Sequence, residues 1–212
     1  MSTWTSRVCA AALGCLVLAG CEDGFPVPGT PSDTLTAEAL QIAPMSRGVV
    51  TLVAPQGFCI DPSSLRQRFA LMARCDTLGA RVPEDAPLAL ITVTTVIGTP
   101  GGTVSADALG AASETVLERS DADGVTLIRV QGTPPSPDLR DTYWRGATKI
   151  GGEVVGMALY EAQSGNALGP RAPRLLQQTL QRTQAQSAAR ADNSATPPDN
   201  IPRRGMFAGL FE

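Results

Sequence analysis

The sequence predicts an α+β fold: a largely antiparallel sheet with two packed helices, the second at the C-terminal end of the domain. Three observations support this class. Short β-rich runs follow one another with brief turns between them, two stretches have the apolar spacing of helices, and Gly151-Gly152 separates two long β-rich runs. Strands joined by tight turns pair antiparallel, and amphipathic helices beside such a sheet pack on its face.

The first half of the domain, which we place at residues 48–190, contains short runs rich in β-branched and apolar residues. Such runs are typical of strands. They lie at 49–53, 58–61, 69–75 and 88–97. Pro55 and Gly57 favour a turn between the first two runs. The run at 88–97 is apolar on both faces, which indicates a central strand.

Two helices are predicted, one after the central strand and one at the end of the domain. Ser105 can cap a helix that runs to about residue 119. Pro173 suits the first turn of a second helix, which runs to about residue 189. The apolar stripe of this second helix consists of Leu175, Leu176, Thr179, Leu180 and Thr183. We expect the stripe to pack on the sheet; binding of a partner helix is the alternative.

Three more β-rich runs lie between these helices, at 125–130, 142–150 and 153–160. The last two flank Gly151-Gly152, which predicts a tight hairpin turn. The polar run at 120–124 contains Asp-x-Asp-Gly, as a calcium loop does at its start, but the later ligands and the closing glutamate are missing. We therefore expect a polar turn between the first helix and the next strand.

The composition narrows the chemistry that the chain can perform. It has no histidine, which removes Ser-His-Asp and Cys-His arrangements and the usual zinc sites. Lys149 is the single lysine, so a lysine nucleophile could only be this residue. The net charge is −3 and no basic patch is visible, which argues against a nucleic-acid partner. The sequence predicts neither a cofactor nor a metal ion.

The first twenty residues have the pattern of an export signal. Arg7 is their only charge, and residues 8–19 form an unbroken run of small and apolar residues. This run is about a dozen residues long, whereas a membrane-spanning helix needs about 20. It ends at Leu18-Ala19-Gly20-Cys21, which resembles the lipobox of bacterial lipoproteins. The alternatives are an ordinary secretory signal that is cut elsewhere and an uncleaved membrane helix.

The lipobox resemblance implies where the protein is held. Residues 1–20 would be removed as a signal peptide, and Cys21 would carry acyl chains on its sulfur and often on its new amino group. The domain would then be lipid-anchored to a membrane of the cell envelope and face the periplasm; inner and outer membrane both stay open. Residues 21–47 contain several prolines and would form a flexible tether.

Cys59 and Cys75 are the two further cysteines of the expected mature chain. Export leads to an oxidising compartment, so the two predict one disulfide. Closing a loop of about 16 residues would stabilise the fold by about 3 kcal/mol. The alternative is a redox pair, although such pairs usually lie close in sequence, as in Cys-x-x-Cys.

Two weaker resemblances concern the domain itself. Pro55-Gln56-Gly57-Phe58 follows an opening strand in a chain closed by a helix, and this layout loosely resembles the PsbP/Mog1/DcrB group of small sandwich domains. Gly57 to Asp61 and the later Cys75-Asp76 also resemble residues of certain proteobacterial lipoproteins. Neither resemblance implies a catalytic residue.

Residues 191–212 are polar and contain prolines, which predicts a disordered tail. Its end carries large apolar side chains beside an arginine pair. These side chains are Met206, Phe207, Leu210 and Phe211. They suggest a short segment that contacts an envelope partner or the membrane; the alternative is a segment that docks on its own domain.

The function predicted from these observations is that of a membrane-anchored envelope lipoprotein acting as a non-enzymatic binding or accessory module. A carboxylate-dependent envelope hydrolase is the alternative, and it would need two acidic groups about 5–9 Å apart in a cleft. The acidic candidates are Asp61, Asp76, Asp121, Asp123 and Glu153. A thiol-redox protein that uses Cys59 and Cys75 is a third hypothesis.

Overall fold

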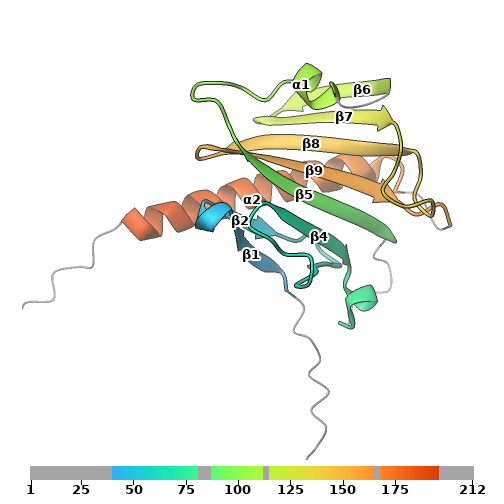
Figure 1. Cartoon of the computed structure of the whole chain (residues 1–212), viewed down its shortest axis with the longest axis horizontal. Coiled ribbons are helices and arrows are strands. Elements are labelled where there is room, and N and C mark those ends of the chain that lie inside the picture. The colour runs from blue at the N-terminus through green and yellow to red at the C-terminus, as the bar shows by residue number, and fades with distance from the viewer. Residues whose placement is uncertain (1–39, 81–86, 112–114, 165–167, 196–212) are drawn as a thin grey trace, which may run out of the picture. The chain divides into compact units, whose positions relative to one another are not determined.

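The computed structural model describes residues 40–80, 87–111, 115–164 and 168–195 (Figure 1). The predicted signal peptide, Cys21 and the apolar segment at 206–211 lie outside the described residues, so those predictions stay predictions. Within the described part, no helix combines the length and the apolar character that crossing a bilayer requires.

A seven-stranded sheet forms the centre of the fold, and all of its neighbouring strands are antiparallel. The strand order is β3-β4-β5-β9-β8-β7-β6. These strands are β3 (Phe58–Ile60), β4 (Phe69–Arg74), β5 (Ala89–Ile97), β6 (Thr115–Ala122), β7 (Val125–Gln131), β8 (Thr142–Ile150) and β9 (Glu153–Glu161). The predicted α+β class is confirmed, and so is the internal position of β5, which lies between β4 and β9.

A second, two-stranded sheet consists of β1 (Ile42–Met45) and β2 (Val50–Val53). β1 lies within the segment that was expected to be a tether. Ala43 and Met45 are buried while Ile42 and Pro44 are exposed, so the segment alternates with the two-residue period of a half-buried strand. Proline is tolerated in β1 because this strand pairs only with β2. The folded part of the chain therefore includes residues before 48.

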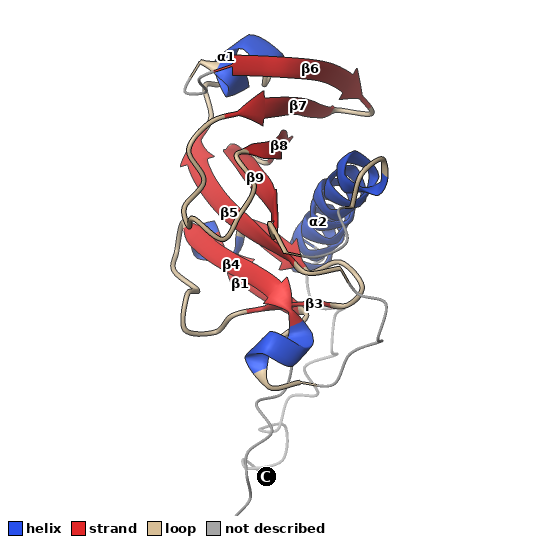
Figure 2. Ribbon diagram, turned by 90° about the vertical axis from the view of Figure 1, so that its right-hand side faces the viewer, coloured by secondary structure: helices blue, strands red, loops and turns tan. Residues whose placement is uncertain are grey.

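The helix α2 (Arg171–Ala195) covers one face of the large sheet (Figure 2). It packs against β2, β7, β8 and β9. Its buried side chains are Ala172, Leu176, Thr179, Leu180, Thr183 and Ser187. The expected packing of the final helix on its own sheet is thus confirmed, and the helix extends past residue 190.

Hydroxyl groups of α2 also bind the backbone of β2. The Thr51 N–H donates to Ser187 Oγ at 2.8 Å, and the Val53 N–H donates to Thr183 Oγ1 at 3.2 Å. These two amides lie on a strand that has a strand partner, β1, on one side. The helix thereby supplies acceptors for one buried and one half-buried backbone donor.

The first predicted helix is much shorter than expected. Ser105 caps α1 (Ala106–Gly110), and its Oγ accepts a hydrogen bond from the Ala108 N–H at 3.1 Å. The prediction of helix up to residue 119 was wrong, because Thr115–Ala122 forms β6 and pairs with β7. The β-branched side chains at its start favour a strand, and Val116 packs against the small apolar cluster of α1 and β7.

The acidic run at 120–124 consequently forms the end of β6 and the hairpin turn to β7 instead of a link from helix to strand. Asp123 and Gly124 have positive φ angles of 54° and 74°. Positive φ at both central residues is the geometry of a two-residue hairpin turn whose twist matches that of its strands. The hairpin predicted at Gly151-Gly152 is confirmed between β8 and β9.

Gly146 on β8 allows α2 to approach the sheet closely. A Cβ atom at this position would lie 2.6 Å from Leu127 Cδ2 and 2.8 Å from Leu180 Cδ1. Both leucines belong to the main core, which fills the space between the large sheet, β2 and α2. The absence of a side chain at residue 146 is therefore a packing requirement of the helix–sheet contact.

Tyr143 and Tyr160 lie side by side on β8 and β9, with ring centroids 4.6 Å apart. Burial is the largest cause that raises the pKa of Tyr160 above its ordinary value, and Tyr143 adds to the increase. The charge of Arg145 and a hydrogen bond with Thr92 act in the opposite direction. Tyr160 therefore stays protonated at neutral pH and serves the packing of the sheet.

Candidate functional site

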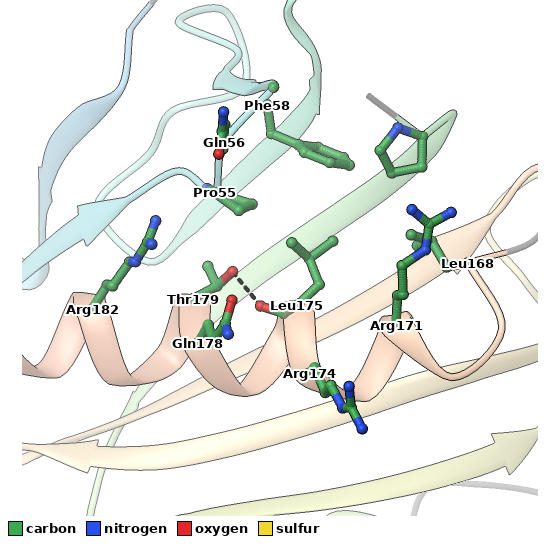
Figure 3. Close-up of a pocket in the computed structure, with 12 residues that line it drawn as sticks. Pro55, Gln56, Phe58, Leu168, Arg171, Arg174, Leu175, Gln178, Thr179 and Arg182 are labelled. Atoms are coloured by element: carbon green, nitrogen blue, oxygen red, sulfur yellow. Dashed lines mark hydrogen bonds between the residues drawn. The ribbon is translucent and has the colours of Figure 1, made fainter. Parts of the chain in front are cut away.

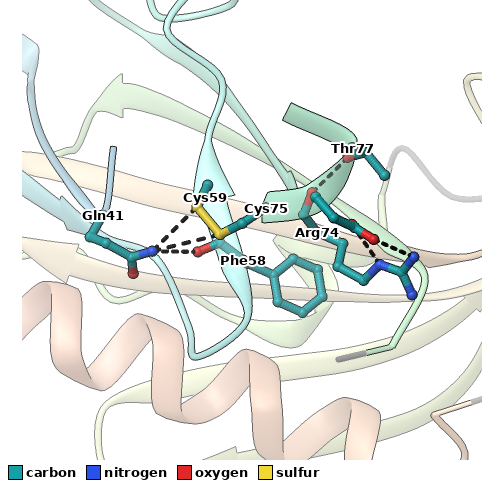
Figure 4. The surroundings of a disulfide bond; sticks show 7 residues. Gln41, Phe58, Cys59, Arg74, Cys75 and Thr77 are labelled. Carbon is teal, nitrogen blue, oxygen red and sulfur yellow. Dashed lines mark hydrogen bonds and ion pairs between the residues drawn. A yellow bond between two sulfur atoms is a disulfide. The ribbon is translucent and has the colours of Figure 1, made fainter. Parts of the chain in front are cut away.

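The predicted disulfide between Cys59 and Cys75 is present, with the two Cα atoms 4.8 Å apart (Figure 4). Antiparallel pairing of β3 with β4 places Cys59 opposite Ala73, two residues before Cys75. The cysteines are only 1% and 2% exposed. The Gln41 side chain covers the bond, with Nε2 3.3 Å from Cys59 Sγ. Such burial favours a structural role over a redox role, because exchange requires access to sulfur.

An ion pair lies beside the disulfide. Arg74 Nε and Nη2 donate to the two carboxylate oxygens of Asp76 at 2.8 and 2.7 Å. The hydrogen bonds from the Arg74 guanidinium are the largest cause that holds the pKa of Asp76 below its usual value. This carboxylate is thus ionised and engaged at the surface, in a geometry that suits neither a general acid nor a shared proton.

The other four carboxylates proposed from the sequence also have local structural contacts. Asp61 accepts hydrogen bonds from the Ser63 N–H at 2.9 Å and from its hydroxyl at 2.8 Å. Glu153 accepts from Arg68 at 3.0 Å. Asp121 accepts from the Thr126 hydroxyl, and Asp123 from the Gln181 amide.

The structure places none of these five carboxylates in the two hollows of the surface described below. The single lysine is engaged as well: Lys149 Nζ donates to the carbonyl oxygens of Thr99 and Gly102 at 3.0 and 2.9 Å. Among the described residues, no group of three or more potential metal-ligating side chains forms a metal site.

A groove of about 350 Å³ lies between the turn that joins β2 to β3 and the first half of α2 (Figure 3). We call it the α2 groove. Its lining residues are Pro55, Gln56, Gly57, Phe58, Pro87, Leu168, Arg171, Arg174, Leu175, Gln178, Thr179 and Arg182. Phe58 and Leu168 are buried beneath it, whereas Leu175 and Pro87 are half-buried and present apolar surface to the groove.

The wall formed by the turn is held by backbone geometry and by the disulfide. Gly57 has a φ angle of 82°, which favours glycine, and the Phe58 N–H donates to the Pro55 carbonyl oxygen at 3.0 Å. The Gly57 carbonyl oxygen accepts from the Cys75 N–H at 3.1 Å. The disulfide therefore fixes both the strand that follows the turn and the segment that hydrogen-bonds to it.

The opposite wall is the side of α2 that carries arginine. Arg182 projects from the helix toward the turn, Arg171 projects beside Leu168 on the same side of the helix, and Arg174 points to the opposite side (Figure 3). All three are exposed. The ion pairs found within the described part of the chain use other arginines, and no carboxylate lines the described groove. Among the described residues, the α2 groove therefore combines apolar surface with arginines that no described carboxylate pairs.

A broader hollow on the other side of the start of α2 has a different character. It shares Arg174 with the α2 groove but also contains carboxylates, and these have hydrogen-bond partners. Glu118 accepts from Arg129 at 2.7 Å, and Glu161 accepts from the Leu168 N–H at 2.7 Å. Its charges are thus largely satisfied internally, which leaves the α2 groove as the better candidate site.

Comparison of the chain with protein-family models and with curated proteins finds no match. A function is therefore inferred from the α2 groove and from the sequence motifs.

The sequence predicts the two segments that form the α2 groove, but it does not predict that they lie next to each other. It predicted the turn at 54–57 and the helix that carries the arginines. It did not place the two segments together. The available signal was the presence of three arginines, at 171, 174 and 182, beside an apolar stripe in a protein of net negative charge.

Proposed function

We propose that the protein is a membrane-anchored envelope lipoprotein whose domain acts as a non-enzymatic binding module, with the α2 groove as its binding surface. This proposal rests on the composition of the α2 groove. Ligand sites typically combine a concave apolar surface with a few polar groups that orient the ligand. Leu175 and Pro87 supply the apolar surface, and Arg171 and Arg182 supply the charged groups.

The surroundings of the acidic side chains support binding in preference to hydrolysis. A carboxylate-dependent hydrolase needs two acidic groups that face one substrate position. The five carboxylates considered from the sequence instead stabilise turns, a hairpin and two ion pairs, of which the pair of Glu153 with Arg68 is partly buried. The groove itself presents cationic and amide groups, which suit recognition of an anionic partner.

The lipobox-like Leu18-Ala19-Gly20-Cys21 supports the proposed anchor. Two or more acyl chains on Cys21 hold a protein stably where one chain gives marginal binding. A protein of net negative charge is repelled by anionic lipid, so the anchor would supply the membrane affinity. The apolar residues at 206–211 remain a second predicted contact with an envelope partner.

Replacing the proposed lipidated cysteine, Cys21→Ser, should move the protein from the membrane fraction to the soluble fraction. The reason is that the anchor, and not the folded domain, would hold the protein at the bilayer. Fractionation of cells followed by immunodetection measures this, with mass spectrometry of the amino terminus. Cys59→Ser serves as the matched control and should stay in the membrane fraction. Full membrane association of the Cys21→Ser protein would contradict the lipid anchor.

A photo-reactive residue in the α2 groove should capture a binding partner in intact cells. We expect p-benzoylphenylalanine at position 178 to give one defined adduct, identified by mass spectrometry, and Arg182→Glu in the same chain to abolish it. The control position is Gln186, which is exposed on the same helix but does not line the groove. Equal adducts at both positions, or none at position 178, would refute the groove as the binding surface.

A further inference from the structure

We infer that the α2 groove binds an extended acidic peptide segment of a partner protein. Two acidic side chains of this segment would pair with Arg171 and Arg182, and an apolar side chain between them would pack on Leu175. This inference rests on the proposed function, because it names the ligand class of the same groove.

The charge of the groove selects an anion. Three arginines line it, and no carboxylate lies among its described lining residues. The whole chain has a net charge of −3, so the described lining of the groove is a local positive region on an acidic protein. Arginine stays charged at all physiological pH values, and its planar fork matches a carboxylate with two parallel hydrogen bonds.

The separation of the arginines selects an extended chain over a small anion. Arg171 and Arg182 are eleven residues apart on one helix, which corresponds to about 16 Å along the axis. A single carboxylate cannot contact both. An extended peptide advances about 3.3 Å per residue, so side chains four residues apart lie about 13 Å apart and reach both guanidinium groups.

The apolar surface lies between the two charges, where such a peptide needs it. Alternate side chains of an extended chain point to the same side, so the residue midway between the two acidic positions also faces the groove. Leu175 lies between Arg171 and Arg182 in the sequence of α2 and is half-buried in the groove wall. The exposed amides of Gln56 and Gln178 supply donors and acceptors for a peptide backbone on opposite walls (Figure 3).

An anionic lipid would contact fewer of the charged groups of the groove than an acidic peptide. Its single head group would pair with one end of the groove and leave the second arginine unpaired. The pairing of two separated cations with an intervening apolar contact therefore favours the peptide.

The test uses the purified full-length protein and a fluorescein-labelled heptapeptide, Ser-Glu-Ser-Leu-Ser-Glu-Ser, with fluorescence anisotropy as the readout. We expect saturable binding that weakens as salt is raised. Arg171→Glu and Arg182→Glu should each weaken the affinity about tenfold or more. Arg190→Glu makes the same charge change on an exposed residue of the same helix outside the groove, and it should leave the affinity unchanged.

A second peptide tests the spacing. Moving the two glutamates to adjacent positions keeps the charge and composition but prevents simultaneous contact with both arginines, so its affinity should fall about tenfold. Circular dichroism of each arginine variant verifies that the fold is retained.

Three results would overturn the inference. They are no saturable binding of the first peptide, equal affinity for the two peptides, or a loss of affinity in Arg190→Glu as large as that in Arg171→Glu and Arg182→Glu. Binding to phosphatidylglycerol vesicles that depends on Arg171 and displaces the peptide would assign the groove to lipid and also overturn it. A specific adduct at position 178 without peptide binding would reject the acidic peptide while the proposed function stands. Absence of both the adduct and the peptide binding would reject the acidic peptide and the proposed function together.

Discussion

Replacing Leu180 with alanine is expected to lower the free energy of unfolding by about 2–5 kcal/mol. Leu180 is fully buried where α2 meets the sheet, beside Leu176 and above Gly146. Truncation removes apolar contacts and leaves a cavity, because the close approach of helix and strand at Gly146 limits collapse. The melting temperature should fall by roughly 5–20 °C in a domain of this size. Thermal and chemical denaturation followed by circular dichroism measure the change.

The matched control for this variant is Ile97→Ala. Ile97 has a branched side chain of the same size, but 75% of its surface is exposed. Its truncation should change the free energy of unfolding by less than about 0.5 kcal/mol. Similar losses from the two substitutions would mean that the contact between α2 and the sheet is not the main source of stability.

Removal of the disulfide is expected to lower the free energy of unfolding by about 3 kcal/mol. The bond closes a loop between residues 16 positions apart and is buried between β3 and the segment after β4. Its loss increases the conformational entropy of the unfolded chain. The double variant Cys59→Ala/Cys75→Ala, studied by guanidinium denaturation, measures this contribution.

Reductant provides the control for the disulfide prediction. A reducing agent should destabilise the wild-type protein by a similar amount and leave the double alanine variant unaffected. Peptide mapping without reduction should find Cys59 joined to Cys75. A wild-type protein whose unfolding midpoint is the same with and without reductant would show that the bond does not contribute to stability.

Local signals in the sequence were sufficient for most of the large sheet. Gly151-Gly152 identified the β8–β9 hairpin because a two-residue glycine turn has few other uses between β-rich runs. The run that became β5 was recognised as central from its apolar character. α2 was recognised from an apolar stripe and from Pro173 near its start.

The errors arose where local spacing and long-range pairing disagreed. Leu109 and Val116 have helical spacing, but Val116 pairs with Val130 of β7 as part of a strand. The prolines of residues 21–47 suggested a tether over the whole segment, although a strand that pairs with one neighbour accommodates proline, as β1 does at Pro44. β6 and β1 both form through hydrogen bonds to strands that a local sequence pattern does not identify.

The α2 groove was not predictable for a related reason. Its walls come from residues 55–58 and 168–182, which are more than a hundred positions apart. The turn and the helix were each predicted, but their meeting depends on how the completed sheet orients α2. The disulfide was predicted because two cysteines in a chain that is expected to be exported leave few alternatives.

The hydrogen bonds from Thr51 and Val53 to hydroxyl groups of α2 join segments 136 and 130 residues apart. β2 is therefore synthesised well before the hydroxyl groups that accept hydrogen bonds from its amides. Contacts between segments so far apart in the sequence require closure of a long loop, and they slow folding relative to local contacts. The native environment of β2 thus depends on a segment that is synthesised more than a hundred residues later.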